Sequence, residues 1–173
     1  MYTQRPFFSE KECFDMLDYY DLNYEDTFRL DWGHESRYQR LLPIEELSVR
    51  SKIESIIKYN HRSVCDDLGM PYFDLTLNEI FISKYEVDEG VGWHFDRRFL
   101  EYHPPYNNQR MYNFSVCLNR DYAGGTLVVD QDVVTTSLGT CTMFDVTNKH
   151  MVEPIELGTR YSLIGWTYKK ALP

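Results

Sequence analysis

From Pro71 onward the sequence is a succession of short segments rich in Val, Ile, Tyr, Phe and Thr, separated by Gly, Asn and Asp. This alternation is typical of β-strands joined by turns. It predicts strands at Leu75–Tyr85, Gly92–Phe95, Arg110–Leu118, Gly125–Val129, Asp132–Ser137, Thr140–Phe144, Lys149–Pro154 and Arg160–Tyr168. So many short strands have to bury their apolar faces against one another, which favours a double-sheet roll of the jelly-roll or cupin kind.

Two helices are predicted before this region. Ser9 and Glu12 have the spacing of a capping box at the start of the first helix. Its apolar stripe is Cys13, Phe14, Met16, Leu17 and Tyr20. The second helix is predicted from about Ile44 to Leu68, because its apolar residues recur at spacings of three and four, and Gly69 and Pro71 then end it. The segment Asp31 to Pro43 lacks a clear period and is interpreted as a loop.

Length and composition fit one mainly β domain. At 173 residues and 43% hydrophobic, the chain can bury a full core. We expect residues 1–70 to be a helical cap and support and residues 71–173 to be the β roll. The formal net charge of −9 disfavours nucleic acid as a partner, since such proteins normally present a basic face. No apolar run approaches the ~20 residues of a membrane helix, so we expect a cytoplasmic protein; its oligomeric state is left open.

His94 and Asp96 are two residues apart at the end of the predicted strand Gly92–Phe95, so in extended backbone both side chains point to the same face. An imidazole and a carboxylate on one face can bind one metal ion, and a hydrogen bond between the two is the alternative. His150, on a later strand, would complete a set of two histidines and one carboxylate. Such a set leaves three positions open on six-coordinate Fe(II), although His150 alone could also be an ordinary polar residue.

Arg160 follows in an otherwise apolar strand, where an unpaired charge would be costly. Its planar guanidinium suits a carboxylate, either that of a dicarboxylate cosubstrate or that of an internal Asp or Glu. The His-x-Asp pair, the later histidine and this arginine all lie in the strand-rich half of the chain. Their joint occurrence favours a single metal-dependent site.

The stretch from Tyr85 to Trp166 resembles the catalytic core of the prolyl 4-hydroxylase-like family of Fe(II)/2-oxoglutarate-dependent dioxygenases. The motifs that carry the resemblance are Tyr85…Gly90…Trp93-His94-Phe95-Asp96, Ser115-Val116-Cys117-Leu118-Asn119, Tyr122-Ala123-Gly124-Gly125-Thr126-Leu127, then Phe144, His150, Val152 and Pro154, and Gly158-Thr159-Arg160-Tyr161. The resemblance implies a double-stranded β-helix in which His94, Asp96 and His150 hold Fe(II).

The same resemblance implies that Arg160 holds the C5 carboxylate of 2-oxoglutarate and that Tyr85 hydrogen-bonds this cosubstrate. Cys117 departs from the family pattern, because a second cosubstrate tyrosine often occurs at its position. The implied reaction uses O2 and 2-oxoglutarate, releases succinate and CO2, and hydroxylates an unactivated C–H bond, with ascorbate as the expected reductant.

We expect the substrate to be a prolyl or other amino-acid side chain in a peptide or protein. One alternative is a hydroxylase of a free amino acid or other small metabolite, and another is a non-catalytic cupin-like module that binds metal or ligand. The segment Arg97 to Gln109 is the one long irregular stretch in the strand region, and such loops often carry specificity. Its Arg97, Arg98, Tyr102 and Tyr106 are therefore candidate substrate contacts.

Overall fold

The computed structural model describes residues 1–31, 38–67, 69, 75–96 and 110–169. The helices in this part of the chain are α1 (Glu10–Leu22), η1 (Tyr24–Asp26) and α2 (Leu47–Asp67). The strands are β1 (Tyr2–Pro6), β2 (Phe28–Asp31), β3 (Tyr38–Pro43), β4 (Leu75–Tyr85), β5 (Val91–His94), β6 (Arg110–Cys117), β7 (Tyr122–Gly124), β8 (Leu127–Val129), β9 (Asp132–Val134), β10 (Thr140–Asp145), β11 (His150–Val152), β12 (Ile155–Gly158) and β13 (Arg160–Lys169). Each strand predicted after Pro71 overlaps an observed one.

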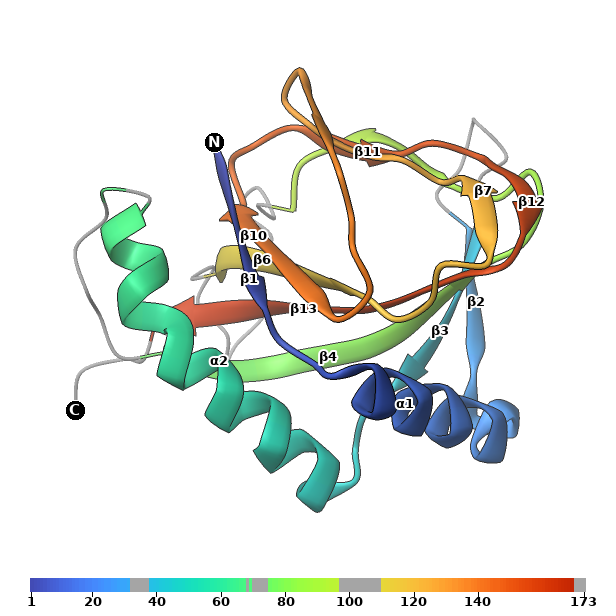
Figure 1. Cartoon of the computed structure of the whole chain (residues 1–173), viewed down its shortest axis with the longest axis horizontal. Coiled ribbons are helices and arrows are strands. Elements are labelled where there is room, and N and C mark those ends of the chain that lie inside the picture. Colours follow the sequence, from blue (N-terminus) through green and yellow to red (C-terminus); the bar gives the residue numbers. More distant parts are fainter. Residues whose placement is uncertain (32–37, 68, 70–74, 97–109, 170–173) are drawn as a thin grey trace.

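The strands form two main sheets, as a double-sheet roll requires. The larger sheet is seven-stranded with the order β1-β10-β6-β13-β4-β3-β2, and the smaller is four-stranded with the order β5-β11-β8-β9. Strands β7 and β12 make a separate antiparallel pair. In Figure 1 the four-stranded sheet and the β7–β12 pair lie over one face of the larger sheet, and α1 and α2 lie against its other face.

One core lies between the helices and the larger sheet. The predicted capping box is present, since the Ser9 side chain accepts a hydrogen bond from the Glu12 N–H and the Glu12 carboxylate accepts one from the Ser9 N–H. Cys13 and Tyr20 of α1 are buried in this core, but Phe14 is 52% exposed. The predicted apolar stripe is therefore wrong at Phe14, which faces away from the sheet.

Helix α2 begins at Leu47, three residues later than predicted. Ile44 is not helical because its N–H donates instead to the carbonyl of Ile80 at 2.9 Å, where the chain leaves the sheet. Gly69 adopts a left-handed φ of 64°, which suits the predicted helix end, while Leu68 and Pro71 lie outside the described residues. Among the helices described, none is both long and apolar enough to cross a bilayer.

The structure corrects the interpretation of Asp31 to Pro43 as a loop. Asp31 ends β2, and Tyr38–Pro43 is strand β3, which pairs with β2 on one side and β4 on the other. Sequence analysis missed β3 because its buried Gln39 interrupts the apolar pattern of a strand. The segment is extended because it pairs with both neighbouring strands. Together with β1, these strands bring three members of the larger sheet from the first 70 residues, so that region is not helical alone.

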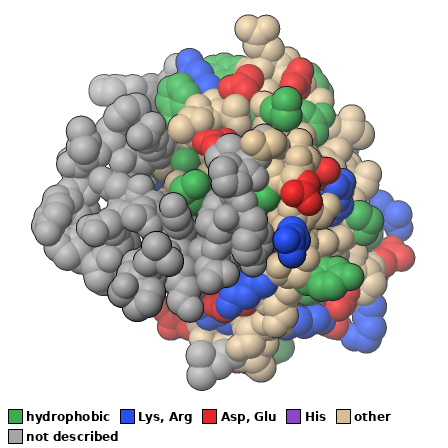
Figure 2. All heavy atoms as spheres, turned by 90° about the vertical axis from the view of Figure 1, so that its left-hand side faces the viewer, with side chains coloured by type: hydrophobic (Ala, Val, Ile, Leu, Met, Phe, Trp, Pro, Cys, Tyr) green, Lys and Arg blue, Asp and Glu red, His purple; other side chains and the backbone are tan. Residues whose placement is uncertain are grey.

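The surface carries mixed charge. On the face shown in Figure 2, the described part shows acidic, basic and apolar side chains interspersed, without a gathering of one kind. Exposed ion pairs such as Lys11–Asp15 at 2.7 Å belong to this surface and contribute little to stability.

The second core, between the two sheets, is the one that surrounds the candidate site.

Candidate functional site

A cavity of about 410 Å³ lies between the seven-stranded and four-stranded sheets. Most of its lining is aromatic or aliphatic. Its polar lining residues are Gln39, Glu79, His94, Asp96, Arg110, Asn113, Ser115, His150 and Arg160. A mostly apolar cavity with a few convergent polar groups is the usual form of a small-molecule site.

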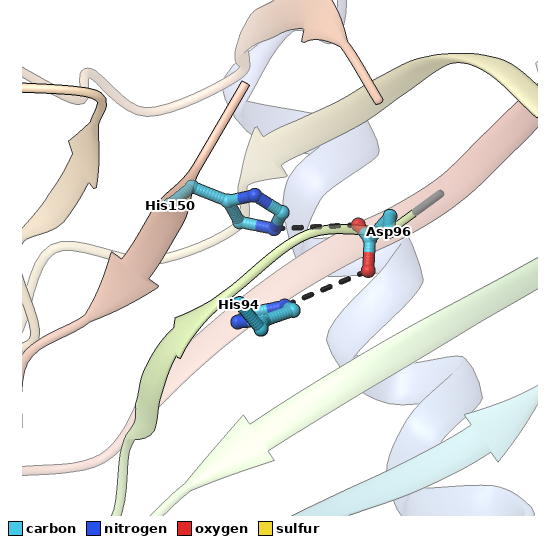
Figure 3. A group of neighbouring side chains, drawn as sticks. All are labelled: His94, Asp96 and His150. Carbon is cyan, nitrogen blue, oxygen red and sulfur yellow. Dashed lines mark ion pairs between the residues drawn. The ribbon is translucent and has the colours of Figure 1, made fainter. Parts of the chain in front are cut away.

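Three of these residues, His94, Asp96 and His150, form one cluster (Figure 3). His94 ends β5 and lies directly opposite His150 at the start of β11, so their side chains share one face. The two rings have centroids 4.1 Å apart. Asp96 Oδ1 lies 3.5 Å from His94 Nε2, and Asp96 Oδ2 lies 3.3 Å from His150 Nε2. The predicted pairing of a His-x-Asp strand with a distant histidine is present.

The orientation of both imidazoles is set by the backbone. His94 Nδ1 lies 2.8 Å from the Gly92 carbonyl oxygen, and His150 Nδ1 lies 3.1 Å from the Asn148 carbonyl oxygen. A carbonyl oxygen only accepts, so each Nδ1 carries a proton, and Nε2 is the ring nitrogen that each histidine turns toward the cluster. Such a second hydrogen bond is what fixes the tautomer of metal-binding histidines.

Electrostatics also favour the metal-binding forms of His94 and Asp96. Burial lowers the pKa of His94, the neighbouring His150 lowers it further, and Asp96 opposes both only in part. Burial alone would raise the pKa of Asp96, but the hydrogen bond and charge of His150, the charge of His94 and a bond from Trp166 outweigh it. The pKa of Asp96 therefore lies well below its usual range. A neutral imidazole and an ionised carboxylate are the forms that bind a cation.

Arg160, at the start of β13, lines the same cavity and is only 2% exposed. Its Nε has no hydrogen-bond partner, and no carboxylate forms an ion pair with it within the described part of the chain. Its guanidinium carbon lies 5.5 Å from the centre of the Tyr85 ring. The alternative of an internal salt bridge is thus not realised among these residues, and a buried cation in a cavity is suited to an anionic ligand.

Gly125 makes room for this arginine. It has a left-handed φ of 64°, and a Cβ at this position would lie 2.9 Å from Arg160 Cδ and 2.3 Å from Ile155 Cδ1. A side chain here would therefore press on the arginine stem and on the second core. The Gly-Gly turn in the sequence thus serves the site as well as the chain reversal.

The side chains of Tyr85 and Cys117 both donate hydrogen bonds, but to different kinds of acceptor. Tyr85 is 3% exposed, and its hydroxyl donates to Gln39 Oε1 at 2.6 Å. Burial raises the pKa of Tyr85 to about 12, although Arg160 opposes this rise, so the hydroxyl keeps its proton. The Cys117 thiol donates to the Asn119 carbonyl oxygen at 3.0 Å. Gln39 escaped sequence analysis because its strand was interpreted as a loop.

Two further contacts to the cluster come from the larger sheet. The indole N–H of Trp166 donates to Asp96 Oδ2 at 3.0 Å, and Arg110 Nη1 lies 3.5 Å from the Asp96 carbonyl oxygen. No local sequence signal identifies these contacts, because they join residues far apart in the chain. The candidate substrate contacts Arg97, Arg98, Tyr102 and Tyr106 lie outside the described residues.

The donor set fits Fe(II) and 2-oxoglutarate. Two imidazoles and one carboxylate are borderline-to-hard ligands, and their ligand atoms all lie within 4.8 Å of one another. A structural zinc site would normally need a fourth protein ligand, and the cluster in the described part of the chain has three. The buried arginine without an internal carboxylate, in the same cavity, suits a dicarboxylate.

Comparison with known proteins agrees with this geometry. The family model described as the 2OG-Fe(II) oxygenase superfamily matches residues 80–168. A PKHD-type hydroxylase of Synechococcus sp. (strain CC9902) is 29% identical over 96 residues, which cover 52% of this chain and 41% of that protein. A PKHD-type hydroxylase of Gloeothece citriformis (strain PCC 7424) is 26% identical over 94 residues, covering 52% of this chain and 42% of that protein. The chain thus spans about two fifths of the length of these curated relatives.

Solved structures confirm the fold as a double-stranded β-helix. A Pseudomonas putida prolyl-4-hydroxylase superposes with a TM-score of 0.73 at 16% identity, covering 98% of this chain and 93% of that one. A viral collagen prolyl hydroxylase from Paramecium Bursaria Chlorella virus-1 superposes with a TM-score of 0.72 at 15% identity, covering 98% and 96%. At these identities the likeness concerns the fold alone.

Proposed function

Because the chain belongs to the 2OG-Fe(II) oxygenase superfamily, we propose that it is a hydroxylase in which His94, Asp96 and His150 bind Fe(II) and Arg160 binds the C5 carboxylate of 2-oxoglutarate. The observation that carries the proposal is the placement of both groups in one cavity. Two imidazoles and a carboxylate form one end of it, and an arginine without an internal carboxylate lines the same space.

When bound, Fe(II) with 2-oxoglutarate supplies the O2 chemistry that hydroxylates an unactivated C–H bond, with succinate and CO2 as the other products. The chain's own part is positioning. The backbone carbonyls of Gly92 and Asn148 hold the two imidazoles with Nε2 toward the cluster. Arg160 orients the cosubstrate as a bidentate clamp. The Tyr85 hydroxyl lines the same cavity, and because it donates its proton to Gln39, it would donate to the cosubstrate only by exchanging that partner.

Exclusion of water is the second contribution of the chain. Phe144 packs against His150, with ring centroids 4.8 Å apart, and is 2% exposed. Val152 and Leu127, also buried, line the cavity from the smaller sheet. These apolar walls keep the reacting centre dry and strengthen the charge interaction between Arg160 and an anionic cosubstrate.

The proposed substrate is a prolyl or other amino-acid side chain in a peptide or protein. The rest of the cavity favours an uncharged group, since Phe28, Leu30 and Phe81 line it and the one further cation, among its described lining residues, is Arg110, which is paired with Glu79. A fold shared with prolyl hydroxylases supports the same class. A free amino acid or other small metabolite is the second candidate, because a cavity of about 410 Å³ also accommodates a whole small molecule.

The test is succinate release from 2-oxoglutarate. The protein is loaded anaerobically with Fe(II) and exposed to O2 with ascorbate as the proposed reductant, in the presence of proline-rich peptides or free amino acids. Stimulation by a peptide supports the first candidate, and stimulation by free amino acids alone supports the second. His94→Ala is the inactive control, and Trp93→Phe, at the exposed neighbouring position, is the matched active one. An iron- and 2-oxoglutarate-loaded protein that releases no succinate above His94→Ala with either panel would indicate a non-catalytic module.

A further inference from the structure

We propose that Trp166 is a positioning residue for Asp96, whose indole N–H holds the carboxylate in the orientation that binds the metal. This inference rests on the proposed iron site. Trp166 lies on β13 in the larger sheet, whereas His94 and His150 lie on the smaller sheet. The bond from Trp166 Nε1 to Asp96 Oδ2, at 3.0 Å, therefore joins the cluster to the opposite wall of the cavity.

Asp96 needs such a support more than the two histidines do. Both histidines belong to paired strands, and each has an Nδ1 bond to a backbone carbonyl. Asp96 lies beyond the end of β5, where its backbone is outside the strand ladder. Its side chain is only 10% exposed, so its orientation depends on the groups that surround it.

The indole bond is the side-chain contact of Asp96 that is compatible with a bound metal. The two histidine contacts, at 3.5 and 3.3 Å, come from the same Nε2 atoms that would bind the ion. An Nε2 that binds a cation carries no proton and can no longer donate to Asp96. An indole N–H only donates and has no affinity for a cation, so it can remain on Oδ2 and favour binding through Oδ1.

Trp166 is itself held in place. The guanidinium carbon of Arg110 lies 3.9 Å from the centre of the Trp166 ring, and the Phe81 ring packs against it edge-on at 6.2 Å. Arg110 is in turn ion-paired with Glu79, and its Nε lies 3.1 Å from the Tyr168 hydroxyl. The indole is therefore held between a stacked guanidinium and a neighbouring aromatic ring before any metal binds. A positioned metal ligand requires this kind of preorganisation.

The test compares Trp166→Phe with Trp93→Phe, using Mn(II) as the probe. Phenylalanine keeps an aromatic ring for the Arg110 stack and removes the N–H together with the second ring of the indole. The same change at Trp93, which is 46% exposed and next to His94, controls for the loss of that ring. Free Mn(II) is titrated by its EPR signal. Loss of a hydrogen bond to a metal ligand typically weakens metal affinity 10–100-fold. We expect at least a 10-fold rise in the Mn(II) dissociation constant of Trp166→Phe, with a changed EPR spectrum of the bound ion, and less than a two-fold rise for Trp93→Phe.

A second measurement uses the unaltered protein loaded with Zn(II) and followed by NMR. The Trp166 indole N–H should exchange with solvent more slowly than that of Trp93, because it stays bonded to Asp96. Exchange as fast as that of Trp93, or a Trp166→Phe protein with wild-type Mn(II) affinity and spectrum, would overturn the positioning role and leave the iron site intact. A wild-type protein that binds no Mn(II) would instead overturn the proposed function, and this inference with it.

Discussion

Replacement of Arg160 by Met should separate stability from cosubstrate binding. Met is unbranched and similar in length, so it can fill the space of the arginine stem without its charge. Arg160 is 2% exposed, its Nε has no partner, and the described residues provide no carboxylate for it. The folded protein therefore carries the desolvation cost of this charge without an internal ion pair. Arg160→Met should leave the free energy of unfolding unchanged or raise it by about 1–2 kcal/mol.

The same substitution should abolish tight binding of 2-oxoglutarate. Each hydrogen bond to a charged group contributes about 1.5–3 kcal/mol, so loss of a bidentate pair costs at least about 3 kcal/mol. At about 1.4 kcal/mol per factor of ten, this corresponds to a rise in the dissociation constant of at least about 100-fold.

Urea unfolding measures the first quantity, and calorimetric titration of 2-oxoglutarate into Mn(II)-loaded protein measures the second. Arg120→Met is the matched control, since the Arg120 side chain is 70% exposed and its ion pair with Glu10 is on the surface. It should change neither quantity appreciably. An Arg160→Met protein destabilised by several kcal/mol that still binds 2-oxoglutarate with wild-type affinity would show that the guanidinium has a structural partner and is not the clamp.

Three further predictions concern stability, each measured by urea unfolding. Gly125→Ala should cost about 2–5 kcal/mol, because it places a Cβ at a left-handed φ and 2.9 Å from Arg160 Cδ; a loss below 1 kcal/mol would contradict this. Tyr85→Phe should cost about 1–3 kcal/mol, because it leaves the buried Gln39 Oε1 without its donor, and an unchanged stability would show that water replaces the hydroxyl. Glu12 has its pKa lowered from 4.5 to about 2 by hydrogen bonds from a lysine of α2 and from the N-cap serine. The stability advantage of wild type over Glu12→Gln should therefore be full above pH 4.5 and vanish as the pH falls toward 2; an advantage that persists at pH 2 would refute it.

The sequence predicted the parts of the fold and site that depend on local composition and on the spacing of neighbouring residues. Strand β4 was predicted with its observed bounds, Leu75–Tyr85, because a long segment rich in aliphatic and aromatic residues is bounded by turn residues. His94 and Asp96 were expected on one face from their spacing alone, and His150 indeed lies opposite His94. The prediction that Arg160 faces an anion site is supported by its burial in the same cavity.

What the sequence did not predict depends on contacts between distant segments. Strand β1 is extended because it pairs with β10, and strand β3 because it pairs with β4. The buried polar Gln39 also interrupts the apolar pattern of β3. Strands β7 and β12 each end in a glycine that reads as a turn, and they pair with each other over more than thirty residues of chain. The Trp166–Asp96 bond joins two residues separated by 70 positions, so no spacing rule identifies it.

The most direct test of the central claim is a crystal structure of the chain with Mn(II) and 2-oxoglutarate, grown without O2. We expect one metal ion bound by His94 Nε2, His150 Nε2 and the Asp96 carboxylate, with the cosubstrate chelating that ion and its C5 carboxylate on Arg160. A metal ion bound elsewhere, or a 2-oxoglutarate molecule that does not contact Arg160, would contradict the account.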